Sequence, residues 1–161
     1  LEVGCWYILP LPLSFRRDKM KIAVSACLLG ENCKYNGGNN FNSELLKRIE
    51  KHEILSICPE VEGGLSIPRD CCEILNGKVM SCKGVDVTSS FEKGAKVCLK
   101  KVMDFHADLI IVQSRSPSCG VNEIYDGSFS HTKIKGNGIF VQKCIEAGLK
   151  VIDIKEYLNY E

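Results

Sequence analysis

Three cysteines, each in a loop with polar companions, are the residues of this chain that could do chemistry. The first, Cys27, lies in the segment SACLLG that begins at Ser25, and Cys58 opens the segment CPEVEGG. The third, Cys119, closes the run SRSPSC, which contains three hydroxyls and a guanidinium. A thiolate at the end of a strand, in a loop rich in backbone amides, has a lowered pKa and can bind a soft metal.

Each cysteine could also have a purely structural role. The neighbouring residues help to decide between that role and a chemical one. A buried cysteine that caps a strand explains Cys27 equally well. A structural loop explains the segment of Cys58, although Pro59 fixes the backbone beside the thiol and Glu60 can share its pocket. An exposed turn is a poorer explanation of the Cys119 segment, because its hydroxyls and loop amides can donate hydrogen bonds to sulfide or to a substrate anion.

The ten cysteines of the chain allow three interpretations. A secreted disulfide scaffold is usually small and poor in core, whereas this chain has long aliphatic stretches. Cys98 and Cys144 lie inside helical patterns and fit buried small hydrophobes. The third interpretation is ligation of a metal or cluster, although the close cysteine spacings of ferredoxins and zinc fingers are absent. Cys33 could be a fourth ligand or a bystander. We therefore expect buried and ligating cysteines together, in a reducing, cytoplasmic compartment.

Length and charge restrict the classes of protein. The chain has 161 residues and a net charge of +1, with no basic stripe, so we expect no nucleic-acid polymer as a partner. No apolar run is long enough to cross a membrane. Residues 1–19 differ from the rest, because an apolar stretch is followed by Arg16 and Arg17, the reverse of a secretory signal. We expect residues 1–19 to be an upstream extension and residues 20–161 to form one domain.

Apolar runs alternate with helical patterns along the domain. The predicted strands cover residues 22–26, 54–57, 108–112 and 151–154, and Asn76-Gly77 predicts a hairpin between residues 73–75 and 78–81. Predicted helices follow Ser43, follow a capping box of Ser89 and Glu92, and cover residues 138–147, with a short helix possible at the end of the chain. Residues 59–69 are expected to form an ordered loop.

Strands that alternate with helices predict an α/β fold: a single domain with a mainly parallel sheet and helices on both faces, like a Rossmann or flavodoxin fold. Ligands bind such sheets at the carboxyl ends of the strands. Three of the predicted strands end on the loops of Cys27, Cys58 and Cys119. The topology therefore predicts that these thiols, far apart in sequence, lie at one edge of the sheet.

The motifs, taken together, resemble a known family. The chain is similar to the 2-thiouracil desulfidase-like family from Met20 to about Ile154. The segments that carry the resemblance are CLLG (27–30), KYNGG (34–38), CPE (58–60), GGL (63–65), PR (68–69), GVDVT (84–88), SPSCG (116–120) and IYDG (124–127). The chain departs from the family where it has Lys34-Tyr35-Asn36 in place of a common Arg-Tyr-Asp, and Cys71-Cys72 in place of a proline pair.

The resemblance implies a [4Fe-4S] cluster held by Cys27, Cys58 and Cys119, with one iron left open. It also implies removal of sulfur from a small thiolated nucleobase without net redox chemistry. Glu60 would handle protons and Ser116 would orient the substrate. We expect three further substrate contacts, from Ser25, Tyr35 and Ser118.

Two other hypotheses use the same thiols. A sulfur-carrier module would bind metal or sulfide and pass sulfur to a partner without hydrolysis, and it would not need Glu60 or Ser116. A mononuclear zinc site would combine the three cysteines with a water molecule. Conversion of 2-thiouracil tests the first, and the absorbance spectrum tests the second.

Overall fold

The computed structural model describes residues 19–160 and is built around a four-stranded parallel sheet. The strands are β1 (Lys21–Ser25), β2 (Glu53–Ile57), β5 (Leu109–Val112) and β8 (Val151–Asp153), in the order β2-β1-β5-β8. Ile22 of β1 lies opposite Ile54 of β2 and Leu109 of β5. The predicted parallel α/β sheet is confirmed. The extension expected over residues 1–19 lies, apart from Lys19, outside the described residues.

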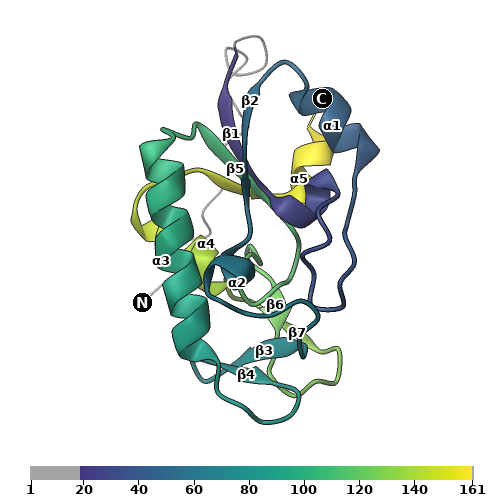
Figure 1. Cartoon of the computed structure of the whole chain (residues 1–161), viewed down its shortest axis with the longest axis vertical. Coiled ribbons are helices and arrows are strands. Elements are labelled where there is room, and N and C mark those ends of the chain that lie inside the picture. The colour runs from purple at the N-terminus through teal and green to yellow at the C-terminus, as the bar shows by residue number, and fades with distance from the viewer. Residues whose placement is uncertain (1–18, 161) are drawn as a thin grey trace.

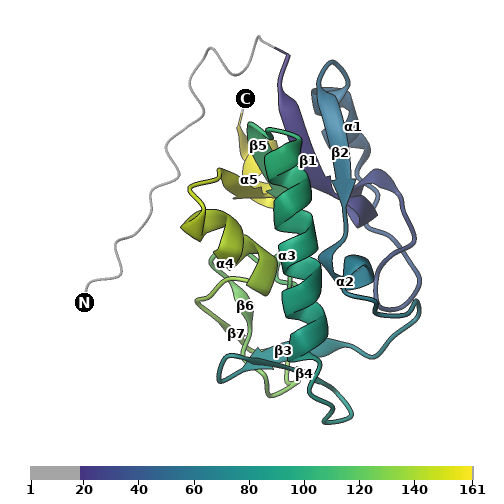
Figure 2. The same ribbon diagram turned by 60° about the vertical axis from the view of Figure 1, so that its left-hand side comes forward.

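Helices cover both faces of this sheet (Figures 1 and 2). On one face α1 (Ser43–Ile49) and α5 (Ile154–Asn159) share a hydrophobic cluster with Ile22 and Val24 of β1. On the other face α3 (Thr88–Asp104) and α4 (Ile139–Glu146) pack with Ala23 of the same strand. Successive side chains of a strand point to opposite faces, so both faces of the apolar run LIIV in β5 are buried.

The smaller elements gather at the carboxyl ends of the strands (Figure 1). The 3₁₀ helix η2 (Ala26–Leu29) follows β1, and the short helix α2 (Pro59–Glu62) follows β2. Two hairpins lie beyond them: β3 (Cys72–Leu75) with β4 (Lys78–Ser81), and β6 (Ile124–Tyr125) with β7 (Lys133–Ile134). None of the helices in the described part of the chain has the length and apolar character of a membrane span.

Two local expectations were wrong and one hairpin was missed. Helix α2 forms inside the stretch expected to be a loop, because Pro59 can occupy a first helical position. Ser89 is no cap: α3 already begins at Thr88, whose amide donates to the carboxylate of Asp86 (2.9 Å). Helix α1 lies where the sequence predicted it and begins at Ser43, with Asn42 as its cap. The β6–β7 hairpin, with two residues in each strand, was not predicted.

Candidate functional site

Cys27 lies in η2, directly beyond the end of β1. Its carbonyl accepts a hydrogen bond from the backbone amide of Asn40 (2.9 Å), and its sulfur accepts one from the Asn40 side chain (3.6 Å). A hydrogen bond from the Cys33 thiol is the main cause that lowers the pKa of Cys27. The loop that follows β1 therefore returns to hold this thiol as a hydrogen-bond acceptor, the role of a thiolate ligand.

Cys58 is the residue that caps the start of α2, at the end of β2. A hydrogen bond from the Cys33 thiol, helped by one from the amide of Val61, lowers the pKa of Cys58 to about 7 against the effect of burial. Helix α2 is pressed closely against α3 at Gly94, where a Cβ atom would lie 1.7 Å from the carbonyl oxygen of Pro59. The absence of a side chain at Gly94 thus lets the Cys58 loop reach its position.

Cys119 lies in the loop that follows β5 and is 4% exposed. Its amide donates to the Ser116 hydroxyl (2.7 Å), and its sulfur lies 3.6 Å from the Ser118 hydroxyl oxygen, within hydrogen-bonding range. Burial raises the pKa of Cys119, while hydrogen bonds from Ser118 and Ser25 act in the opposite direction. The surrounding hydroxyls offer a buried sulfur the hydrogen bonds that its charged form needs.

These three loops follow neighbouring strands, in the order β2, β1 and β5. Cys27 lies between the other two and within electrostatic reach of each. A negative charge on Cys27 contributes to raising the pKa of Cys119, and a negative charge on Cys58 opposes the lowering of the pKa of Cys27. The structure therefore brings the three loops to one edge of the sheet, as the topology predicted. Among residues 19–160, no group of three or more His, Cys, Asp or Glu side chains is arranged to hold a single metal ion.

A chain of hydrogen bonds joins Glu60 to the serines of the Cys119 loop. The Ser118 hydroxyl donates to Glu60 Oε2 (2.9 Å), and the hydroxyls of Ser116 and Ser118 are 3.1 Å apart. Since Ser116 already accepts from the Cys119 amide, its own proton is available for Ser118. The result is a continuous path for a proton from Ser116 through Ser118 to Glu60.

Arg69 holds the other side of Glu60. Its Nε atom lies 3.2 Å from Glu60 Oε1, and the two side chains are only 7% and 16% exposed. The same guanidinium donates to the carbonyls of Cys33 (2.9 Å) and Ser66 (3.2 Å), and the Arg69 amide donates to the carbonyl of Tyr35 (2.7 Å). Sequence reasoning recorded Arg69 only as part of a motif and missed this role, since its partners are up to 36 residues away.

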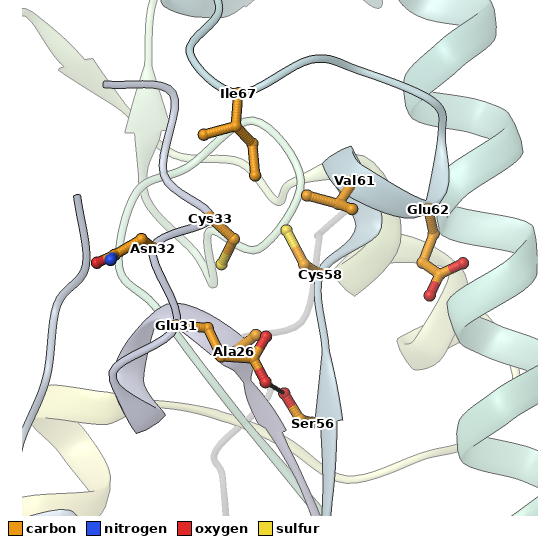
Figure 3. A pocket seen from close by; sticks show the side chains of 9 residues that line it. All are labelled: Ala26, Glu31, Asn32, Cys33, Ser56, Cys58, Val61, Glu62 and Ile67. Carbon is orange, nitrogen blue, oxygen red and sulfur yellow. Dashed lines mark hydrogen bonds between the residues drawn. The ribbon is translucent and has the colours of Figure 1, made fainter. Parts of the chain in front are cut away.

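Beside these loops lies a cavity of about 350 Å³. The side chains of Cys33 and Cys58 lie across from each other at its wall, with the apolar side chains of Val61 and Ile67 nearby (Figure 3). The Ser56 hydroxyl donates to a Glu31 carboxylate oxygen (3.0 Å) at the opposite side. The full lining is Ala26, Glu31, Asn32, Cys33, Ser56, Cys58, Val61, Glu62 and Ile67.

Two predicted contact residues occupy different settings. Ser25 is buried and accepts a hydrogen bond from the Gln113 amide (3.1 Å), which ties β1 to β5 beneath Cys119. Tyr35 is 46% exposed on the loop between η2 and α1, beside Arg69. A role of either residue in binding a substrate stays a prediction.

Comparison with known proteins places this arrangement in a family. The family model described as 2-thiouracil desulfurase matches residues 22–156, which hold all three cysteine loops. The chain belongs to this family. It is 35% identical over 145 residues to the uncharacterized protein YbbK of Bacillus subtilis (strain 168), an alignment that covers 84% of this chain and 96% of YbbK.

A solved structure agrees with the family assignment. The chain is similar to the [4Fe-4S]-dependent thiouracil desulfidase TudS, with a TM-score of 0.80 and 32% sequence identity. The match covers 88% of this chain and 95% of TudS. The resemblance drawn from the sequence motifs is thereby confirmed, and family membership indicates an enzyme of thiouracil desulfuration.

Proposed function

We propose that this protein is a [4Fe-4S]-dependent desulfidase that converts a small thiolated nucleobase, such as 2-thiouracil, to the oxo base and hydrogen sulfide. The observation that carries the proposal is the chain from Ser116 through Ser118 to Glu60, which borders the edge where the three cysteine loops meet. A sulfur carrier has no use for such a proton path, whereas addition of water to a carbon–sulfur bond requires one.

The proposed cluster ligands are Cys27, Cys58 and Cys119. Thiolates on a zinc ion lie about 2.3 Å from one centre, and the described side chains offer no such group. An iron–sulfur cluster instead distributes its thiolates over separate irons, which suits loops from three neighbouring strands. Three protein ligands leave one iron of the cluster open.

Cys33 fits a supporting role better than that of a fourth ligand. Its thiol is within hydrogen-bonding range of both Cys27 and Cys58, whereas each ligand of such a cluster belongs to its own iron. Hydrogen bonds to ligand sulfurs are one of the factors that set the reduction potential of a cluster. We therefore assign Cys33 as a hydrogen-bond donor whose single thiol proton is shared between two of the proposed ligands, Cys27 and Cys58.

The reaction replaces a C=S bond by a C=O bond at the expense of one water molecule. When bound, the cluster supplies a Lewis-acidic iron for the thiocarbonyl sulfur. Ser116 orients the attacking water and receives its proton as it passes its own to Ser118, and Ser118 passes one to Glu60. Glu60 returns this first proton to the sulfur. As the C–S bond breaks and C=O forms, the same chain of side chains takes the remaining hydroxyl proton, and Glu60 delivers it to the departing sulfur, so that both hydrogens of water leave in hydrogen sulfide. No electron is gained or lost.

The remaining assignments follow the same site. Ser25, Tyr35 and Ser118 are proposed to contact the substrate, and Arg69 to hold Glu60 in position. A small substrate fits the 350 Å³ cavity beside Cys58, and we propose no nucleic-acid or membrane partner. Because an open iron and free thiols persist under reducing conditions, we place the enzyme in the cytoplasm, with residues 20–161 as its single domain.

One anaerobic assay tests the proposal. Purified protein is mixed with 2-thiouracil, and uracil and sulfide are measured together with iron content and visible absorbance. We expect equal amounts of uracil and sulfide. Glu60→Gln should keep the absorbance of the cluster and lose about 10²–10⁴-fold in turnover, the usual contribution of positioned acid–base groups. Cys58→Ala and Cys119→Ala should lose the cluster itself.

A matched control is Glu92→Gln on α3, outside the lining of the cavity. Its carboxylate pairs with Lys143 (2.8 Å) rather than with Ser118, so turnover should remain near that of the wild type. Full activity of Glu60→Gln would remove Glu60 from the mechanism. Loaded protein that binds sulfide but forms no uracil from thiouracil would instead favour the sulfur carrier.

A further inference from the structure

Two thiols outside the proposed cluster loops face each other at the root of the β3–β4 hairpin. Cys72 pairs with Ser81 in the antiparallel register, so the next pair outward is Cys71 with Cys82. The Cys82 amide donates to the Cys71 carbonyl (2.9 Å). Directly opposed residues of antiparallel strands have Cα atoms about 4.5–5.5 Å apart, within the roughly 4.4–6.8 Å that a disulfide spans.

Partial burial, followed by a hydrogen bond with the Cys82 thiol, raises the pKa of Cys71. Cys82 is exposed and Cys71 is partly so, and both are reduced in the structure. The pair is thus preassembled and open to a small reagent.

Cys72 does not belong to the pair, although it follows Cys71 directly. Alternation along a strand directs its side chain to the other face of the hairpin. There its sulfur donates to the carbonyl of Asp70 (3.5 Å), and burial raises the pKa of Cys72 to about 12. The chain therefore supplies its own control: Cys72 is a neighbouring thiol whose ladder partner is Ser81, not a cysteine.

Two further features hold the pair in register. The two-residue turn Asn76-Gly77 fixes which residues of β3 and β4 are opposite. An ion pair between Lys83 and Asp70 (3.4 Å) spans the same root of the hairpin. A slip of one residue would break both, so the two cysteines stay aligned without a covalent bond.

We propose that Cys71 and Cys82 form a second thiol site, a dithiol that exchanges with low-molecular-weight disulfides and closes to a cross-strand disulfide. The exposed Cys82 thiolate attacks the small disulfide, whose S–S bond breaks and releases one thiol. Cys71 then attacks the Cys82 sulfur in the mixed disulfide and releases the second thiol. Two protein thiols are oxidised, one small disulfide is reduced to two thiols, and the protons of the protein thiols pass to the leaving groups.

The position of this site gives the exchange a local consequence. Arg69, two residues before Cys71, holds Glu60 and the carbonyl of Cys33. A disulfide at the root of the hairpin would lock the strand that continues directly from Arg69. The site is nevertheless separate from the proposed cluster, since Cys71 and Cys82 are not among the proposed ligands.

The test treats the cluster-loaded protein anaerobically with oxidised glutathione, followed by alkylation of free thiols, trypsin digestion and mass spectrometry. Cleavage after Arg69, Lys78 and Lys83 places Cys71 in the peptide 70–78 and Cys82 in the peptide 79–83. We expect these two peptides to become linked in the wild type and in Cys72→Ser. In Cys71→Ser the link should be lost, and a glutathione adduct should remain on Cys82.

Two results would overturn the proposal. One is a stable glutathione adduct on Cys82 of the wild type with no linked peptides, since it would show that Cys71 cannot reach the mixed disulfide. The other is a link that persists in Cys71→Ser but disappears in Cys72→Ser, which would make Cys72 the partner. Neither result depends on desulfuration, so the dithiol can fail while the proposed function holds, and the reverse.

Discussion

The contact between α2 and α3 gives the sharpest test of how the site is assembled. Gly94→Ala adds a Cβ atom that would lie 1.7 Å from the carbonyl oxygen of Pro59 and 2.8 Å from the amide of Gly63. Ordinary contact begins at 3.4 Å, so α2 would have to retreat by well over 1 Å. Because Cys58 and Glu60 are carried by this short helix, both must move with it.

The magnitudes predict a folded protein with poor activity. Overpacking costs about 1–3 kcal/mol, and the better helix propensity of alanine returns about 1 kcal/mol. The free energy of unfolding should therefore fall by about 2 kcal/mol, or somewhat more because the atom met is backbone. This loss is still a fraction of the roughly 5–15 kcal/mol of a typical domain. A displacement of about 1 Å at a catalytic group can cost about 10²-fold in rate, and we expect a loss of at least that order in turnover per bound cluster.

The assay combines denaturant unfolding, iron content and anaerobic turnover of 2-thiouracil on Gly94→Ala and on a control, Lys96→Ala. Lys96 lies on the exposed side of the same helix, so its loss should leave all three measurements close to those of the wild type. Unchanged stability and unchanged turnover per iron in Gly94→Ala would refute the reasoning, because α2 could not then be seated on α3 as described.

Three further predictions concern the polar side chains around Glu60. Arg69→Met should lower turnover by about 10²-fold by releasing Glu60, and Arg69→Lys should restore only part of it because an ammonium lacks the forked donors; full activity of the methionine variant would contradict this. Ser118→Ala should approach the turnover of Glu60→Gln, and the double variant should be little worse than either, since groups that act as a unit are not additive; additive losses would mean separate roles. Cys33→Ala should keep the iron content and lower the reduction potential of the cluster, measured by anaerobic redox titration, because the cluster loses a hydrogen bond. Loss of iron in this variant would instead make Cys33 a ligand.

The sheet and its carboxyl edge could be predicted because buried parallel strands leave a direct signature. The run LIIV of β5 is apolar at every position, since α3 and α4 cover one face and α5 with its neighbours the other. Once the strands are known, parallel topology places the residues after them on one edge. That step required no contact between side chains and therefore no information beyond the sequence.

Side-chain partners across the site could not be predicted in the same way. Ser118 and Glu60 are 58 residues apart and Arg69 and Cys33 are 36 apart, and neither pair belongs to a repeating pattern. The start of α3 was misplaced for a related reason: Ser89 and Glu92 have the spacing of a capping box, but Glu92 pairs with Lys143 of α4 instead (2.8 Å). Tertiary contacts decide which side chains pair and where such a helix begins, and these contacts cannot be predicted from local residue spacing.

The strand order shows which parts of the site the hydrogen bond between Ser118 and Glu60 connects. Glu60 follows β2 and Ser118 follows β5, and these strands are separated by β1, which leads to Cys27. The hydrogen bond therefore spans the middle cysteine loop and joins the two outer ones. Positioning of the two outer proposed ligands, Cys58 and Cys119, and completion of the proton path are consequently a single structural event. An outer loop that moves enough to lose its thiol also breaks the path, so the protein is not expected to retain proton transfer when either outer thiol is displaced.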